Sequence, residues 1–469
     1  MSSINNLHLY PYLFQPQSSP PITAEWGQLL VPENRRKVDS QMISLTFVRF
    51  RCTSQYPGTP IVFLQGGPGI SLLNNLPRLW DIPMLRPPLD IADFIFVEQR
   101  GVGQSRPTLD CPGTYDIPLD EPGSADLYLE AHRVYLSNAV SFWGEAGVDI
   151  SSYNAREMAA DIDDLRQALG YTQLSLLGGS FGSHHGLAIL RFYGQHIQRA
   201  LLWSVEGPNH TMKLPSNIQS HLELLNDLLK EDITLNRRVP DLLDLMASIL
   251  EKLESRPVTV ETIHPESDDA VEVTLGKYDL QLATATGLGK TAFLRALPSR
   301  YLTMAAGDYS WLGEQVIQLR LGQKSSLMYE TTDYASGATV ARREQIAQEA
   351  PTTLLGDAIN EPFHQLGDVL GDIDLGDNFR GRLVCEVPAL LVCGTLDVRT
   401  PISNAQELLP DLAKGQLLTI DGVSHDLAYR GDHIEKLTNI RDQFLRGEPV
   451  NYEQLSSPFV FQSIENNVH

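Results

Sequence analysis

Short apolar runs that end at glycine recur along this chain and alternate with helical stretches. Two of them are "TPIVFLQGGPG" (59–69) and "DFIFVEQRGVGQS" (93–105). A strand that is apolar at nearly every position has both faces buried, which is typical of a parallel sheet covered by helices on both sides. The chain is therefore expected to fold as an α/β protein.

The helical stretches between these runs are amphipathic. In "REMAADIDDLRQALG" (156–170), the residues Met158, Ile162, Leu165 and Leu169 recur at spacings of three and four. This spacing places them on one face of a helix, and the glycine that follows them is a typical helix end. The strand "QLSLLG", the helix "HHGLAILRFYG" and the strand "RALLWSV" come next, so the alternation continues.

The α/β pattern is interrupted once. Residues 209–381 are helical and charged, and apolar strands resume at "ALLVCG" (389–394) and "GQLLTI" (415–420). A chain of 469 residues is long enough for one large domain with an insertion. We predict one mostly parallel sheet built from residues 1–208 and 382–469, with the middle segment inserted as a helical cap. The opening "GQLLVPENRRKVDSQMISLTFVRF" predicts an antiparallel pair added at one edge of the sheet.

Composition excludes several classes of function. The chain has 36 basic and 58 acidic residues, a formal charge of −22, and this surface repels a nucleic-acid backbone. Its four cysteines lack C-x-x-C spacing, which argues against a zinc site or a disulfide scaffold. The N-terminus has no secretory signal, and no window approaches the ~18 apolar residues of a membrane span. We expect a cytoplasmic protein without metal or other cofactor, acting on a small molecule; the oligomeric state is not indicated.

The pattern G-x-S-x-G appears as "GGSFG" (178–182), between a predicted strand and a predicted helix. In a nucleophile elbow the glycines allow a sharp turn that lifts Ser180 above the sheet edge. The N–H of Phe181 then lies at a helix N-terminus, where it can stabilise an oxyanion. Taken alone, the motif is equally compatible with an ordinary glycine-rich turn between a strand and a helix.

An acid and a histidine follow in the order that this elbow predicts. Asp397 comes three residues after the glycine that ends "ALLVCG", and His425 lies in the loop after the next strand. Asp397 would fix the tautomer of the imidazole, and His425 would take the proton of Ser180. A helix cap is the alternative for Asp397, and a surface position is the alternative for His425. Three residues at three strand ends favour a catalytic triad.

The loop "QGGPG" (65–69) is a candidate for the second oxyanion donor. A hydrolase of this type needs an N–H from the loop after an early strand, and Gly67 is our choice, with Gly66 next to it. The alternative is a plain Gly-Pro turn.

Two further motifs attract attention and are set aside. "GLGKT" (287–291) imitates a phosphate-binding loop, but Thr284 stands where the first glycine is required and no strand precedes it. His184 and His185 lie too early on the helix after the elbow to act as its base, and adjacent residues do not share a helix face. We interpret them as a packing or solvent-facing pair.

The segments "VPENR", "QGGPG", "FVEQRGVGQSRP", "GGSFGS", "GTLDVRTP" and "GVSHD" occur in this order. Together they resemble the proline iminopeptidase and tripeptidyl aminopeptidase family of serine peptidases, over most of residues 26–208 and 382–430. The resemblance implies an α/β-hydrolase fold with a helical cap. It also implies Ser180 as nucleophile, Asp397 as acid and His425 as base.

The resemblance also implies how a substrate is held. Family members that release N-terminal residues bind the free amine with acidic groups, and Glu206 and Glu330 are the candidates here. Gln65 departs from the histidine that usually begins the glycine loop, so a side-chain role at that position is not carried over. We expect a serine hydrolase that releases N-terminal residues from short peptides. The alternatives are a carboxylesterase or lactonase with the same triad, or a non-catalytic binding protein of this fold.

Overall fold

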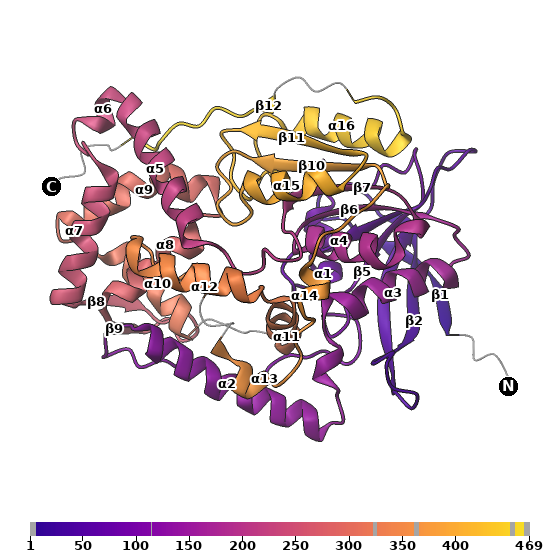
Figure 1. Ribbon diagram of the computed structural model, residues 1–469, viewed down its shortest axis with the longest axis horizontal. Helices are drawn as coiled ribbons and strands as arrows, with labels where there is room; N and C mark the ends of the chain where they lie inside the picture. Colours follow the sequence, from indigo (N-terminus) through magenta and orange to yellow (C-terminus); the bar gives the residue numbers. More distant parts are fainter. Residues whose placement is uncertain (1–5, 114, 322–325, 361–364, 451–454, 464–469) are drawn as a thin grey trace.

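A central sheet of ten described strands dominates the computed structural model, which describes residues 6–113, 115–321, 326–360, 365–450 and 455–463 (Figure 1). Its order is β1-β2-β3-β5-β4-β6-β7-β10-β11-β12. The strands are β1 (Leu7–Phe14), β2 (Ile22–Pro32), β3 (Met42–Phe50), β4 (Ile61–Leu64), β5 (Phe94–Val97), β6 (Leu174–Ser180), β7 (Ile197–Val205), β10 (Ala389–Gly394), β11 (Gly415–Asp421) and β12 (Leu455–Ser456).

Strand direction follows the sequence pattern. All pairs from β5 through β12 are parallel, whereas β1, β2 and β3 pair antiparallel with one another and β3 pairs antiparallel with β5. The prediction of a mostly parallel sheet is confirmed, and β2 with β3 forms the expected antiparallel pair. The strand β1, which extends this edge by one more hairpin, was not predicted.

Helices cover both faces of the sheet. One face carries α1 (Leu72–Leu79) and α16 (Ile434–Arg446), and the other carries α3 (Ala155–Ala168), α4 (Phe181–Tyr193) and α15 (Ile402–Leu408). Successive side chains of a strand point to opposite faces. Accordingly Leu177 of β6 packs into the first layer and Leu176 into the second. Burial on both faces explains why these strands are continuously apolar.

The segment between β7 and β10 builds a body of its own, to the left of the sheet in Figure 1. It contains the helices α5 (Pro215–Glu231), α6 (Ile233–Asn236), α7 (Leu242–Ser255), α8 (Lys277–Gly287), α9 (Thr291–Ala305), α10 (Ser310–Leu321), α11 (Leu327–Ser336), α12 (Val340–Glu349), α13 (Gly367–Leu370) and α14 (Asp377–Arg380). Most of these helices share a hydrophobic cluster separate from the two sheet layers. The segment is helical as expected, but it also holds a hairpin, β8 (Val258–Ile263) and β9 (Ala270–Leu275), that was not predicted. Five of the six residues of β8 (VTVETI) are β-branched, which favours a strand, but this short and largely exposed segment lies within a stretch whose other signals are helical.

Segments from outside this insertion also contact it, among them a long helix and the end of the described chain. Helix α2 (Ala125–Glu145) runs along its lower side and packs against α11 and α13 (Figure 1). Near the other end of the chain, the N–H of Gln462 donates to the carbonyl oxygen of Arg295 in α9 at 2.8 Å. The boundaries at residues 208 and 381 stay a prediction. The remaining short helices are the 3-10 turns η1 (Ile150–Ser152), η2 (Gly194–His196), η3 (Ala350–Thr352) and η5 (Leu409–Asp411).

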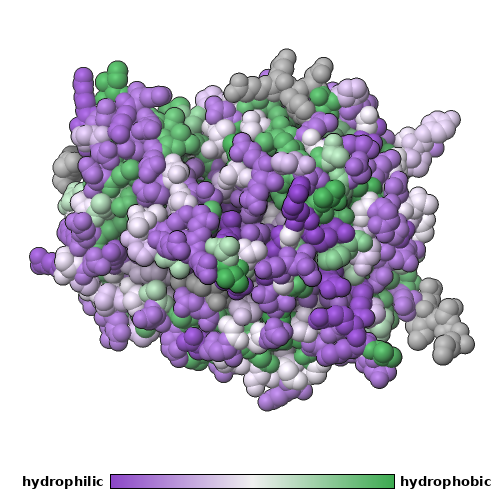
Figure 2. Space-filling model, in the orientation of Figure 1, coloured by the Kyte–Doolittle hydropathy of each residue, from purple (hydrophilic) through white to green (hydrophobic). Residues whose placement is uncertain are grey.

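Hydrophilic side chains cover most of the face seen in Figure 2, with hydrophobic ones scattered among them. Within the described part of the chain, none of the helices combines the length and apolar character that a membrane crossing requires. All four cysteines are free thiols, and Cys393 is buried in β10 as its apolar surroundings predict.

Candidate active site

Ser180 occupies a strained turn between β6 and α4. Its backbone has φ 55° and ψ −129°, a conformation that costs a non-glycine residue about 1–3 kcal/mol. Strain of this kind persists only where the surroundings hold it, and it is typical of nucleophile elbows. The turn projects the serine side chain from the carboxyl edge of the parallel strands.

The glycines around Ser180 are required by close packing. A Cβ at Gly182 would lie 2.1 Å from the carbonyl oxygen of Leu64 in β4, and one at Gly179 would lie 2.0 Å from Nε1 of Trp203 in β7. Real Cβ atoms do not approach other atoms this closely. The two neighbouring strands therefore dictate why "GGSFG" has glycine at these positions.

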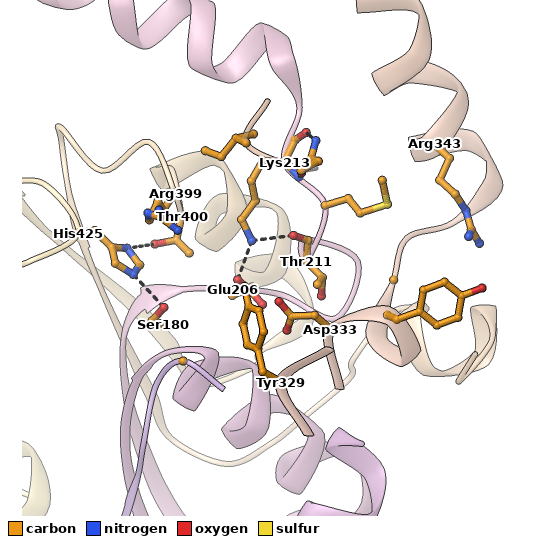
Figure 3. Close-up of a pocket in the computed structure, with 16 residues that line it drawn as sticks. Ser180, Glu206, Thr211, Lys213, Tyr329, Asp333, Arg343, Arg399, Thr400 and His425 are labelled. Carbon is orange, nitrogen blue, oxygen red and sulfur yellow. Dashed lines mark hydrogen bonds and ion pairs between the residues drawn. The ribbon is translucent and has the colours of Figure 1, made fainter. Parts of the chain in front are cut away.

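A chain of hydrogen bonds joins the three residues predicted as a triad, and Figure 3 shows its link between His425 and Ser180. Nε2 of His425 lies 2.8 Å from Oγ of Ser180, although the two residues are 245 positions apart in sequence. Nδ1 of His425 lies 2.9 Å from Oδ2 of Asp397 and 3.1 Å from Oδ1. The imidazole thus lies between hydroxyl and carboxylate, as general-base activation of a serine requires.

Thr400 holds Asp397 in place and was not singled out from the sequence. Its hydroxyl donates to Oδ2 of Asp397 at 2.7 Å, and its N–H donates to Oδ1 at 3.0 Å. Burial alone would raise the pKa of Asp397, but His425 and the two donors of Thr400 outweigh it and lower the pKa below its usual range. The carboxylate is therefore ionised beside the imidazole. The D-x-x-T spacing in "LDVRT" is the signal that indicates such a contact.

The two predicted oxyanion donors lie beside Ser180. Phe181 is the first residue of α4, so its N–H has no acceptor within the helix. Gly67 lies in the loop after β4, lines the same cavity as Ser180 and His425, and has φ 121°. Gln99 braces this loop, because its Nε2 donates to the carbonyl oxygen of Gln65 and its Oε1 accepts from the N–H of Gly69. The positions are compatible with an oxyanion hole.

Two cavities meet at Ser180 and His425. The larger has a volume of about 690 Å³ and extends between the sheet edge and the insertion, past Gly67 and Glu330. The smaller, of about 90 Å³, lies on the side of Glu206. The two predicted substrate-binding carboxylates therefore belong to different cavities, and the structure does not bring them together.

Glu206 follows β7 and faces the smaller cavity, but a cation already contacts it. Nζ of Lys213 lies 2.8 Å from Oε2 of Glu206 and donates to the carbonyl oxygen of Thr211, as Figure 3 shows. It also donates to the carbonyl oxygen of His210. Burial alone would raise the pKa of Glu206, yet Lys213, followed by His184, lowers it below its usual range. Glu206 is thus an ionised carboxylate with a resident counter-charge, and sequence reasoning missed Lys213.

Asp333 is the second carboxyl group of the smaller cavity. It lies on α11, three residues after Glu330, and Figure 3 shows it beside Glu206 and Tyr329. Burial, and then the charge of Glu206, hold the pKa of Asp333 well above its usual range. Asp333, and not Glu330, is thus the residue of α11 that shares a cavity with Glu206. The sequence offered no means to choose between two acidic residues on one helix.

Glu330 lies in the wall of the larger cavity and is almost fully buried. Its Oε1 is 3.1 Å from Nε2 of His132 on α2. Burial, together with the charge of Glu330, raises the pKa of the neighbouring Tyr115. Glu330 therefore lines the same cavity as Ser180, but its carboxyl group already contacts His132 of α2.

His184 and His185 are a buried packing pair, and neither lines the two cavities. The ring of His184 lies 3.2 Å from the carbonyl oxygen of Gly207 and 3.1 Å from the hydroxyl of Ser336 at the end of α11. Burial lowers the pKa of His185 to about 4.

The segment "GLGKT" connects α8 to α9 and is hydrogen-bonded to the loop that carries His425. Oγ1 of Thr291 donates to Oδ1 of Asp426 at 2.5 Å and accepts from the N–H of Ser424 at 3.2 Å. The hydroxyl of Ser424 donates to the carbonyl oxygen of Leu288 at 3.0 Å. Both neighbours of the histidine are therefore tied to the insertion, which the rejected resemblance to a phosphate loop gave no reason to expect.

Comparison with protein families is consistent with this geometry. The model of the family described as "alpha/beta hydrolase fold" matches residues 59–432. A relative named serine protease Hip1 from Mycobacterium tuberculosis is 22% identical, over 89% of this chain and 84% of its own length. A tripeptidyl aminopeptidase from Streptomyces lividans is 26% identical over 40% of this chain and 36% of its own length.

Solved structures with similar coordinates include an esterase from Exiguobacterium antarcticum, with 16% identity and a TM-score of 0.37. That similarity covers 87% of this chain and 97% of the esterase. A mutant epoxide hydrolase from Vigna radiata has 12% identity and a TM-score of 0.38, covering 90% of this chain and 98% of that one.

Proposed function

Because the chain belongs to the α/β-hydrolase family and is a serine hydrolase of that fold, we propose that it releases N-terminal residues from short peptides through an acyl-enzyme on Ser180. The observation that carries the proposal is the Ser180–His425–Asp397 hydrogen-bond chain at the mouth of a cavity with buried carboxyl groups. The names of the relatives, a serine protease and a tripeptidyl aminopeptidase, support the same reaction class.

The reaction begins with proton transfer from Oγ of Ser180 to Nε2 of His425 while Oγ attacks the substrate carbonyl carbon. The carbonyl oxygen becomes an oxyanion held by the N–H groups of Gly67 and Phe181, where each donor contributes about 10²–10³ in rate. The C–N bond then breaks, and His425 gives its proton to the departing amine. Water repeats the sequence on the acyl-enzyme and frees Ser180.

The free amine of the substrate is assigned to the smaller cavity. Lys213 neutralises one carboxylate oxygen of Glu206, so the charge available for a second cation comes chiefly from Asp333. An incoming ammonium group favours the ionised form of Asp333 and lowers its pKa, which makes binding and ionisation mutually reinforcing. Glu330 serves the larger cavity in this assignment. Release of an N-terminal proline is one variant of the proposal, because these contacts do not select the side chain of the residue that is released.

A second candidate is a carboxylesterase or lactonase with the same triad. The contact between Lys213 and Glu206 favours it, because a neutral acyl group needs no counter-charge in this cavity. Esters and peptides with blocked amines would then be hydrolysed as readily as free ones.

Two experiments test the proposal. A fluorophosphonate probe should label the wild-type protein and not the Ser180→Ala variant, and equal labelling would remove Ser180 as nucleophile. Aminoacyl-naphthylamides should be hydrolysed at least tenfold faster than their N-acetylated forms, and Asp333→Asn should reduce that preference. Equal turnover of free and acetylated substrates by the wild type would instead identify the esterase-like alternative.

A further inference from the structure

Arg399 is a cation beside the triad that is not neutralised by a described carboxylate. It lies in the loop between Asp397 and Thr400, is half-buried, and lines both cavities that contain Ser180. Its Nη2 donates to the carbonyl oxygen of Thr286 at 3.2 Å. Among the residues that the structure describes, no Asp or Glu oxygen comes within 4.0 Å of its guanidinium, the limit for an ion pair.

The other cations of the smaller cavity are different. Lys213 contacts Glu206 at 2.8 Å, and Arg343 contacts Asp374 at 3.5 Å. A buried or half-buried charge is costly unless an opposite charge meets it. In a chain with a net charge of −22, a guanidinium that faces a cavity and forms no ion pair with a described carboxylate is therefore unusual.

The structure holds this guanidinium in place from two sides. A Cβ at Gly289 would lie 2.7 Å from its Nε, so the side chain packs directly against the backbone between α8 and α9. The backbone of Arg399 is also held, because the next residue, Thr400, is hydrogen-bonded to Asp397 and so anchors the loop. A guanidinium with restricted motion loses little entropy when it binds, and its planar fork matches both oxygens of a carboxylate.

Arg399 lies on the side of the active site where the leaving group of the substrate is expected. Figure 3 shows Arg399 next to His425 and Thr400, whereas Asp333 lies beyond Glu206 as seen from His425 and Ser180. His425 protonates the departing amine, so the leaving group lies next to the imidazole. A peptide whose amino end is held near Asp333 therefore extends past His425 toward Arg399.

We propose that Arg399 binds the C-terminal carboxylate of the substrate, so that the preferred substrates are short peptides with a free carboxyl end. The assignment rests on the proposed peptidase function and narrows its substrate class to small peptides bound at both charged termini. A peptide amide, which has no negative charge at this end, leaves the guanidinium without its partner.

The test compares each peptide with its own amide. The substrates are di-, tri- and tetrapeptides that begin with the residue preferred among the aminoacyl-naphthylamides. Each is prepared as a free acid and as a C-terminal amide, and kcat/KM is measured for both. One charge-assisted pair predicts an acid-to-amide ratio of about 10–100 for the peptide of the best length. In Arg399→Gln this ratio should fall to about one, and in Arg399→Lys it should lie between the two.

The ratio within one variant cancels any general damage to the triad. Arg382→Gln, at an exposed arginine that lines neither cavity, is the control that should keep the wild-type ratio. A wild-type ratio near one at every length, or a ratio unchanged in Arg399→Gln, overturns the assignment while the peptidase function stands. Absence of hydrolysis for acids and amides alike overturns the peptidase function, and the assignment with it.

Discussion

Replacing Thr291 by valine tests whether the insertion positions His425. The hydroxyl of Thr291 contacts both neighbours of His425, as donor to Asp426 and as acceptor from the N–H of Ser424. Valine has nearly the same shape but neither donates nor accepts. The change therefore removes the two hydrogen bonds and leaves the packing of α9 in place.

The magnitude follows from the burial of the two partners. Ser424 is fully buried, so its N–H loses its partner without access to water, which costs about 1–3 kcal/mol. Asp426 still accepts from the N–H of Thr291 at 3.2 Å, and its side chain is partly exposed. Loss of the hydroxyl bond should therefore cost about 1.5 kcal/mol, the lower end of the range for a hydrogen bond to a charged group. Together we expect about 3 kcal/mol less free energy of unfolding.

The catalytic effect comes from the histidine that this loop carries. A displacement of a catalytic group by about 1 Å can reduce a rate by about 10²-fold. We expect kcat of Thr291→Val to fall by about 10- to 100-fold, whereas Thr291→Ser, which keeps the hydroxyl, stays within about threefold of the wild type. Denaturant unfolding and steady-state hydrolysis of the best naphthylamide measure the two quantities.

The reasoning would be refuted by a Thr291→Val protein with wild-type kcat. A protein that loses stability but not activity would show that the contact is structural only, because the position of His425 would then be set by Asp397 alone.

Three further predictions concern the site and its surroundings. Thr400→Val removes a 2.7 Å hydrogen bond from the buried carboxylate of Asp397, so kcat/KM should fall by about 10- to 100-fold while Thr400→Ser remains active; a fully active valine variant would contradict it. Gly182→Ala places a Cβ 2.1 Å from a backbone oxygen of β4 and should lower the melting temperature strongly. By contrast, Gly144→Ala in α2, which meets nothing within 4 Å, should not lower it. The pKa of His185 is lowered to about 4 by burial, so the unfolded chain binds a proton that the folded one excludes. The free energy of unfolding should therefore fall by about 3 kcal/mol on this account as the pH drops from 6.5 to 4, and His185→Asn should show a shallower slope over that range.

The sequence was sufficient for the sheet and for the three central residues because both depend on strand order. Continuous apolar strands predict a sheet buried on both faces, and the carboxyl ends of parallel strands meet at one edge. Ser180 ends such a strand, and Asp397 and His425 each follow one, so their juxtaposition could be predicted without knowing any distance. Thr400 was within reach through its spacing from Asp397, but a short polar spacing has many structural uses.

The substrate side of the site could not be obtained in this way. Glu206 and Glu330 were chosen as acidic residues near the triad, yet Lys213 neutralises the first and His132 contacts the second. Asp333 faces the smaller cavity instead. Each of these contacts joins segments whose relative position depends on how the insertion packs on the sheet, and periodicity within a helix carries no information about that packing.

The same division applies to the charges and loops around the triad. The sequence alone determined a parallel sheet with a serine, an acid and a histidine at the ends of three of its strands, because hydrophobic pattern and chain order suffice for that. Only the tertiary structure decided that "GLGKT" holds the histidine loop through Thr291, and that Arg399 faces the cavities without an ion pair to a described carboxylate. The reason is physical: hydrogen bonds and ion pairs act over a few ångströms, so their partners are known only when distant segments have been placed side by side.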